Sequence, residues 1–191
     1  MANPTCRQII AEALEENGAR GLGDVPEAVE AARGLTRLQA MWSSGVESGL
    51  FGRVAEVVAK GDYTAKEGER VFAGGHAITL PTSIDDPDAE GGVRRPRDFA
   101  MVQVVDEGVA PKVSLYDAHE AAWTRIDNLT LDDGCPFGCR YRHGLVAALA
   151  VSLAPLGGQV GDITGAYAAT LRQALSLRQS APRRNADLEF M

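Results

Sequence analysis

An apolar run around residue 150 constrains the fold of this chain more than any other feature. From Leu145 to Ala154, Ser152 is the single polar residue in a segment rich in alanine and leucine. Both residue types favour helices, so the segment predicts a helix over residues 140–154 rather than a strand. A helix that is apolar on every side has no face suited to water and must be covered by other elements. Because a bilayer-spanning helix needs about 20 such residues, we expect a central core helix and no membrane contact.

Two amphipathic helices are predicted in the first quarter of the chain. Thr5 and Gln8 have the spacing of a capping box, and apolar residues then recur with helical period to about residue 17. A second helix is predicted to begin after Asp24 and to continue to about Gly45, because apolar residues again recur at steps of three or four. A Gly-rich turn separates the two segments, so we expect an antiparallel helical pair.

The pattern changes to that of a small antiparallel β insert over residues 50–118. Its clearest strands are residues 99–105 and 112–116, with a hairpin turn signal at Glu107-Gly108. Residues 84–98 form a predicted irregular loop that is longer than the usual connection. Loops of that length are commonly either disordered or contact elements.

The loop at 84–98 combines charges of both signs. Four acidic residues precede the basic residues Arg94, Arg95 and Arg97. Such clusters are usual in a solvated loop, and the alternative is a contact with a neighbouring subunit or a partner protein. The sequence leaves both interpretations open.

Helical patterns return after residue 118. Helices are predicted over three further segments, at 118–126, 140–154 and about 159–177. The chain is therefore predicted to be mainly α with a β insert (an α+β fold), in which a bundle of about four helices is interrupted by a small antiparallel β subdomain. The predicted parts are a helical pair at 1–49, the β insert at 50–118, the remaining bundle helices at 119–179 and an extended tail at 180–191.

Charge and cysteine content narrow the function classes. With 26 acidic and 19 basic residues, the net charge is −7, which disfavours tight binding to nucleic acid through its phosphates. This charge still suits a surface past which DNA must slide without sticking. The three cysteines are an odd number, so a disulfide framework is not indicated and a reducing compartment is expected.

A metal site is the alternative function that the sequence suggests. Cys135, Cys139 and His143 follow one another at steps of four, so on a continuous helix they would share a face, and Cys6 could join them. A small zinc-binding interaction module would use these residues. Zinc sites usually take two short ligand pairs, however, and the second pair is missing here.

No pattern in the sequence indicates an active site. Cys139 could be paired with His143 or His119 as a nucleophile and its base, but no strand-to-helix elbow surrounds the cysteine. The Gly-rich segment at 157–161 lacks the Gly-Lys-Ser/Thr ending of a phosphate-binding loop. We therefore expect a protein that is not an enzyme and that uses no cofactor.

The first 42 residues resemble a known family of viral proteins. The segment from Thr5 to Gly18, followed by a Gly-rich turn and then by Ala31 to Trp42, looks like the head-to-tail adaptor proteins of tailed bacteriophages, also called connector, tail accessory or head-completion proteins. In that family a first helix ends in Leu-x-x-x-Gly, and a longer helix ends in Leu-x-x-Met-x-x-Trp. Here the second ending is compressed to Leu38-Gln-Ala-Met41-Trp42. By order of elements the chain resembles the short-tailed-phage version with a β insert.

The resemblance implies a structural role in a virion or a related gene transfer particle. Such adaptors form a ring, usually dodecameric, beneath the portal protein. The ring extends the channel for double-stranded DNA, helps to retain the packaged DNA and serves as the platform for tail or nozzle proteins. The expected location is the head-tail junction, after assembly in the cytoplasm of the bacterial host.

The resemblance implies contacts for two groups of residues. In the family, C-terminal segments commonly dock on the portal, and the residues that would do so here are Arg183, Arg184, Leu188 and Phe190. The β insert, including Arg94, Arg95 and Arg97, would contact a neighbouring subunit or the tail.

Overall fold

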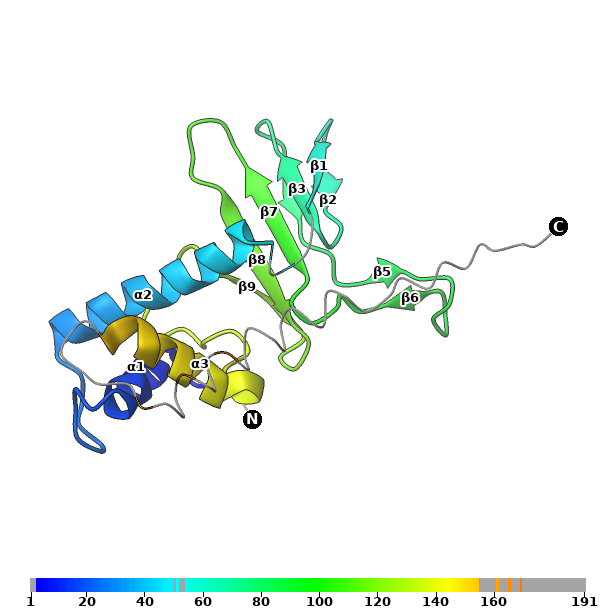
Figure 1. Ribbon diagram of the computed structural model, residues 1–191. Helices are drawn as coiled ribbons and strands as arrows, with labels where there is room; N and C mark the ends of the chain where they lie inside the picture. Colours follow the sequence, from blue (N-terminus) through cyan, green and yellow to red (C-terminus); the bar gives the residue numbers. More distant parts are fainter. Residues whose placement is uncertain are drawn as a thin grey trace.

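The computed structural model describes residues 3–49, 51, 54–154, 161, 165 and 169 of the 191-residue chain. Within these residues the chain forms three helices and nine strands (Figure 1). The helices are α1 (Cys6–Glu16), α2 (Ala28–Glu47) and α3 (Gly138–Leu153). The strands are β1 (Ala55–Val58), β2 (Tyr63–Thr64), β3 (Glu69–Phe72), β4 (Ile78–Thr79), β5 (Ile84–Asp85), β6 (Val93–Arg94), β7 (Met101–Val105), β8 (Lys112–Asp117) and β9 (Ala122–Arg125).

Helices α1 and α2 form in the segments that the sequence predicts. The capping box at the start of α1 is present, since the Thr5 hydroxyl accepts a hydrogen bond from the backbone N–H of Gln8 at 3.2 Å and the Gln8 side chain accepts one from the backbone of Thr5 at 2.8 Å. A glycine allows α2 to approach α1 closely. A Cβ atom on Gly34 would lie 2.4 Å from Cγ2 of Ile10, so a larger residue would push the helices apart.

The predicted core helix is also present, as α3. Its residues Leu145, Leu149 and Leu153 are fully buried against α1, α2 and the sheet. One side of α3 is more open than predicted, because Val151 is 39% exposed. Among the described residues, no helix combines the length and the apolar character needed to cross a membrane.

A five-stranded mixed sheet has the order β1-β3-β7-β8-β9. Strands β1, β3 and β7 are parallel, whereas β7, β8 and β9 are antiparallel. Met101 of β7 lies opposite Leu115 of β8, and both side chains point to the helices. The next residue, Val102, points to the opposite face, as strand alternation requires.

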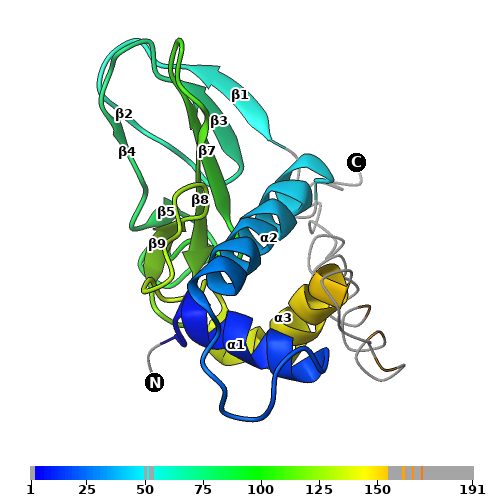
Figure 2. The ribbon, with the colours of Figure 1, turned by 90° about the vertical axis from the view of Figure 1, so that its left-hand side faces the viewer.

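The sheet separates two apolar layers. The three helices lie together on one side of it (Figure 2), and the larger core fills the space between them. On the other side the parallel pair β2–β4 covers a smaller core that includes Ala65, Val71 and Val102. The indole N–H of Trp123 in β9 donates to the Pro81 carbonyl at 2.7 Å and ties β9 to the segment after β4.

The predicted fold class is wrong. The described residues form three helices on a mixed five-stranded sheet with two further strand pairs, which is closer to an α/β arrangement than to a four-helix bundle with a small antiparallel insert. The reason is long-range pairing. Strand β3 lies between β1 and β7 and is parallel to both, and no local sequence pattern specifies such partners.

One predicted helix is a turn and a strand. Residues 118–126 were expected to be helical, but they contain the β8–β9 turn and β9. The Asp117 carboxylate accepts hydrogen bonds from the backbone N–H groups of His119 and Glu120, and Ala121 takes a left-handed conformation with φ 53°. These features reverse the chain before a helical turn can form. The helix predicted at about 159–177 lies outside the described residues apart from positions 161, 165 and 169, and the tail at 180–191 lies entirely outside them.

The loop predicted at 84–98 contains regular structure. Strands β5 and β6 pair in an antiparallel hairpin, with Ile84 opposite Arg94. Its turn is closed by the bond from the backbone N–H of Asp86 to the Gly92 carbonyl at 2.9 Å. The hairpin projects from the body of the molecule (Figure 1).

Candidate functional site

Arg94 anchors the β5–β6 hairpin to the rest of the sheet region. Its guanidinium forms an ion pair with Glu67, from the segment before β3, and a second with Asp86 at 3.0 Å. The side chains of Arg94 and Glu67 are only 22% and 21% exposed. Burial alone would raise the pKa of Glu67, but the hydrogen bonds from Arg94 and from the backbone N–H of Arg97 hold the pKa below its usual value. Arg94 therefore has a structural role within the subunit.

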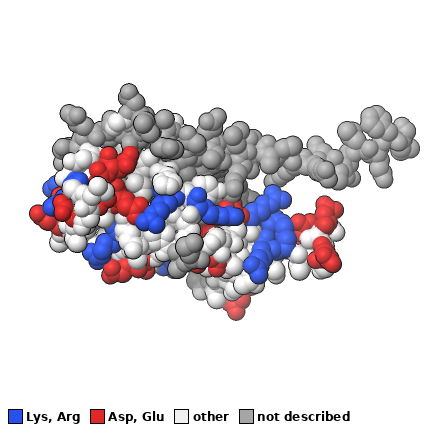
Figure 3. All heavy atoms as spheres, turned by 90° about the horizontal axis from the view of Figure 1, so that it is seen from below, with Lys and Arg blue, Asp and Glu red and all other residues white. Residues whose placement is uncertain are grey.

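Arg95 and Arg97 differ from Arg94 because they are exposed. Seen from below, Lys and Arg side chains gather beside the acidic end of the hairpin (Figure 3). Arg94 is paired with Asp86 inside this segment, whereas Arg95 and Arg97 are exposed. A surface of this kind can pair with a complementary surface of another subunit or protein.

The predicted portal-binding residues cannot be placed. Arg183, Arg184, Leu188 and Phe190 lie outside the described residues.

Three apolar side chains are exposed in the turn before α2 and in its first turn. Leu22, Val25 and Val29 are 94%, 77% and 60% exposed. Val29 also lines a shallow groove of about 670 Å³, whose other lining residues are Ala28, Ala32, Arg33, Thr36 and Arg37. Val29 and the apolar residues beside it in this groove are a candidate protein contact.

The sequence-predicted metal ligands Cys135, Cys139 and His143 do not form a site. Cys135 is fully buried before the start of α3, where its thiol is hydrogen-bonded to the buried thiol of Cys6. This bond and burial raise the pKa of Cys135. His143 instead lines a cleft of about 320 Å³ between α1 and α3. The remaining residues that line this cleft are Glu12, Glu15, Glu16, Arg20, Leu22, Val146 and Ala147.

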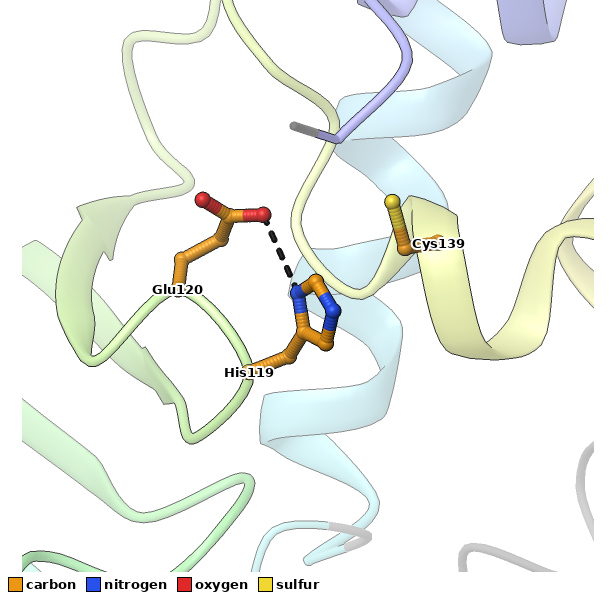
Figure 4. A group of neighbouring side chains, drawn as sticks. All are labelled: His119, Glu120 and Cys139. Atoms are coloured by element: carbon orange, nitrogen blue, oxygen red, sulfur yellow. Dashed lines mark hydrogen bonds and ion pairs between the residues drawn. The ribbon is translucent and has the colours of Figure 1, made fainter. Parts of the chain in front are cut away.

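Cys139 lies beside His119, which the sequence analysis considered as its base, and beside Glu120, which the sequence analysis did not single out. His119 and Glu120, in the β8–β9 turn, face Cys139 in the first turn of α3 (Figure 4). One potential ligand atom from each of the three residues lies within 4.8 Å of the other two. The His119 Nδ1 and Glu120 Oε1 atoms are 3.1 Å apart. Among the residues that the structure describes, this is the group whose geometry suits a metal ion.

A buried carboxylate, Asp117, holds the two sides of this group together. Its Oδ1 accepts a hydrogen bond from the backbone of His119 at 2.9 Å, while its Oδ2 accepts one from the backbone of Phe137 at 2.9 Å and one from the Asn3 amide at 2.8 Å. The Asn3 side-chain oxygen in turn accepts a hydrogen bond from the backbone N–H of Cys139 at 3.0 Å. The β8–β9 turn and the start of α3 are therefore fixed relative to each other.

The ionisation of Asp117 depends on the same bonds. The residue is only 1% exposed, and burial opposes its negative charge. The hydrogen bonds from Asn3 and from three backbone N–H groups outweigh burial and lower the pKa of Asp117. The carboxylate thus stays ionised at neutral pH without a basic side chain among the partners that set its pKa.

Sequence comparisons provide no functional assignment. No protein-family model matches this chain, and a comparison with curated proteins finds no match. Its function must be argued from its own residues.

Proposed function

We propose that this chain is a structural subunit of a tailed-bacteriophage virion, namely a head-to-tail adaptor that forms a ring beneath the portal. The observation that carries the proposal is the helical pair α1–α2. The residues that resemble the adaptor family, from Thr5 to Trp42, lie in this pair and the turn between its helices. Its tight contact between Gly34 and Ile10 accounts for one glycine within that segment.

The surfaces of the subunit support an assembly role. A ring built from identical subunits needs two different, complementary surfaces on each subunit. The β5–β6 hairpin offers charges of both signs for such a contact, and the exposed Val25 and Val29, just before and at the start of α2, are a separate candidate contact. A net charge of −7 also suits the wall of a channel through which DNA passes without sticking.

The proposed partners follow from this role. They are the portal ring, identical subunits in a ring of twelve by analogy with the family, the tail or nozzle proteins, and double-stranded DNA that passes through the channel without sequence-specific binding. The proposed role requires no catalysis and no membrane. The protein would work at the head-tail junction after assembly in the host cytoplasm.

Electron microscopy of the purified protein, alone and mixed with the portal ring of the same virus, tests the proposal. We expect an added ring density on one end of the portal. A chain truncated before Ser180 should keep its circular dichroism spectrum and lose portal attachment, since Arg183, Arg184, Leu188 and Phe190 are removed. Failure of the full-length chain to bind the portal would contradict the adaptor role, whereas binding by the truncated chain would contradict only the role of the tail.

A further inference from the structure

Three side chains of different chemistry converge where the β8–β9 turn meets α3. His119 offers an imidazole nitrogen, Glu120 a carboxylate oxygen and Cys139 a thiol sulfur (Figure 4). These are the three donor types that zinc takes in proteins. Calcium and magnesium prefer sites made of oxygen alone, so the mixed donor set favours a transition metal.

The distances among the donor atoms are close to those of a tetrahedral site. Two nitrogen or oxygen ligands bound to tetrahedral zinc lie about 3.3 Å apart, and a nitrogen and a sulfur ligand about 3.6 Å apart. His119 Nδ1 and Glu120 Oε1 share a hydrogen bond of 3.1 Å, so these two atoms already lie near the first value. Every pair of donor atoms in the group lies within 4.8 Å. To reach the tetrahedral distances, a donor atom has to move by up to about 1 Å, which rotation of its side chain can supply.

The backbone that carries the donors is already fixed without an ion. Asp117 binds the turn that contains His119 and Glu120, and Asn3 connects Asp117 to the backbone of Cys139. Ligands held by such supporting hydrogen bonds need little reorganisation when a metal binds.

We propose that His119, Glu120 and Cys139 bind one zinc ion. The Cys139 thiol loses its proton to solvent on binding, so affinity increases with pH. The His119 and Glu120 side chains are 37% and 33% exposed, which leaves the fourth coordination position open to water. The ion joins the β8–β9 turn of the sheet to the start of α3 in the helical layer. This site does not depend on the adaptor role, and either can fail without the other.

Titration of the reduced, metal-free protein with Co²⁺ and Zn²⁺ tests the site. Co²⁺ bound to a thiolate gives a ligand-to-metal charge-transfer band in the near ultraviolet, so the band reports whether a cysteine is a ligand. We expect one equivalent of Co²⁺ to produce this band and Zn²⁺ to displace it. We also expect Zn²⁺ to raise the thermal unfolding midpoint, because the ion binds only the folded site.

Substitutions of the proposed ligands and of matched residues identify the donors. Cys139→Ser should abolish the charge-transfer band, and His119→Gln and Glu120→Gln should weaken binding at least about tenfold. The chain contains three histidines, so His76→Gln and His143→Gln, at exposed positions, are controls that should leave affinity unchanged. Circular dichroism of each variant confirms that it folds.

Two results would overturn the proposal. The first is the absence of stoichiometric binding by the reduced wild-type protein. The second is a band that disappears in His143→Gln and persists in His119→Gln, which would assign the metal to the Cys135, Cys139 and His143 set predicted from sequence spacing.

Discussion

Asp117 at the end of β8 accepts a hydrogen bond from the backbone N–H of Phe137, the residue that precedes α3, at 2.9 Å. This bond joins the mixed sheet to the helical layer across 20 residues of sequence. Phe137 needs such support, because it is fully buried and has a left-handed backbone with φ 61°. A buried carboxylate therefore sets the position of the core helix relative to the sheet.

Removal of this carboxylate should destabilise the whole fold. We expect Asp117→Ala to lower the free energy of unfolding by about 2–4 kcal/mol, because several N–H donors lose their acceptor in a buried place. Urea unfolding followed by circular dichroism measures the change. Asp62→Ala, at an exposed position, is the matched control and should change the free energy by less than about 0.5 kcal/mol. Equal effects of the two substitutions would show that Asp117 does not hold the two layers together.

Acid should destabilise the protein through the same residue. The pKa of Asp117 is lowered in the folded state, and so is the pKa of Glu67. A lowered folded pKa contributes stability above the unfolded pKa, and this contribution is lost as the pH falls through the folded value. We therefore expect the free energy of unfolding to decrease as the pH is lowered below about 4. Urea titrations at several pH values should show a shallower fall in Asp117→Asn, and an unchanged pH profile in that variant would exclude Asp117 as a source.

The elements that sequence reasoning found are those with local causes. Helix α1 can be predicted from the sequence because its causes are local. They are the capping box of Thr5 and Gln8 and the apolar residues that follow within the same helix. The continuous apolar run after Gly144 likewise identifies α3 from its own composition. The parallel partners of β3 are set by packing between distant segments, and this is why the predicted four-helix bundle is wrong.

The candidate metal site also depends on contacts between residues that are distant in the sequence. Steps of four would place Cys135 and Cys139 on one face only of a continuous helix, and α3 begins at Gly138, so Cys135 lies before the helix. His119 and Cys139 are 20 residues apart and meet only because the β8–β9 turn packs against α3. One local signal was available, since an aspartate two residues before His119 is typical of a side-chain-capped turn. The Ala-Ala-Trp segment that follows favours a helix by composition, and for this reason a helix was predicted there instead of a turn.

The approach of α1 and α2 at Gly34 should be sensitive to a single methyl group. We expect Gly34→Ala to lower the free energy of unfolding by about 1–3 kcal/mol, because the new Cβ would lie 2.4 Å from Cγ2 of Ile10. A double-mutant cycle with Ile10→Ala separates this clash from helix propensity. The cost of Gly34→Ala should be smaller when Ile10 is already shortened. An identical cost in both backgrounds would show that the two side chains do not compete for space.

The three arginines of the β5–β6 hairpin should separate into structural and contact residues. Arg94→Ala leaves Glu67 without its main partner, so we expect faster amide hydrogen exchange across β5 and β6. Arg95→Ala changes an exposed side chain and should leave exchange within the hairpin unaltered.

If the basic patch pairs with a neighbouring subunit in the proposed ring, the charge reversals Arg95→Glu and Arg97→Glu should shift the protein from ring to monomer in sedimentation velocity. Because charge pairing across a surface is screened by salt, the same shift should appear in the wild-type protein at high ionic strength. Rings that persist in both reversals would place the subunit contact elsewhere, and the apolar start of α2 at Val25 and Val29 would then be the next surface to substitute.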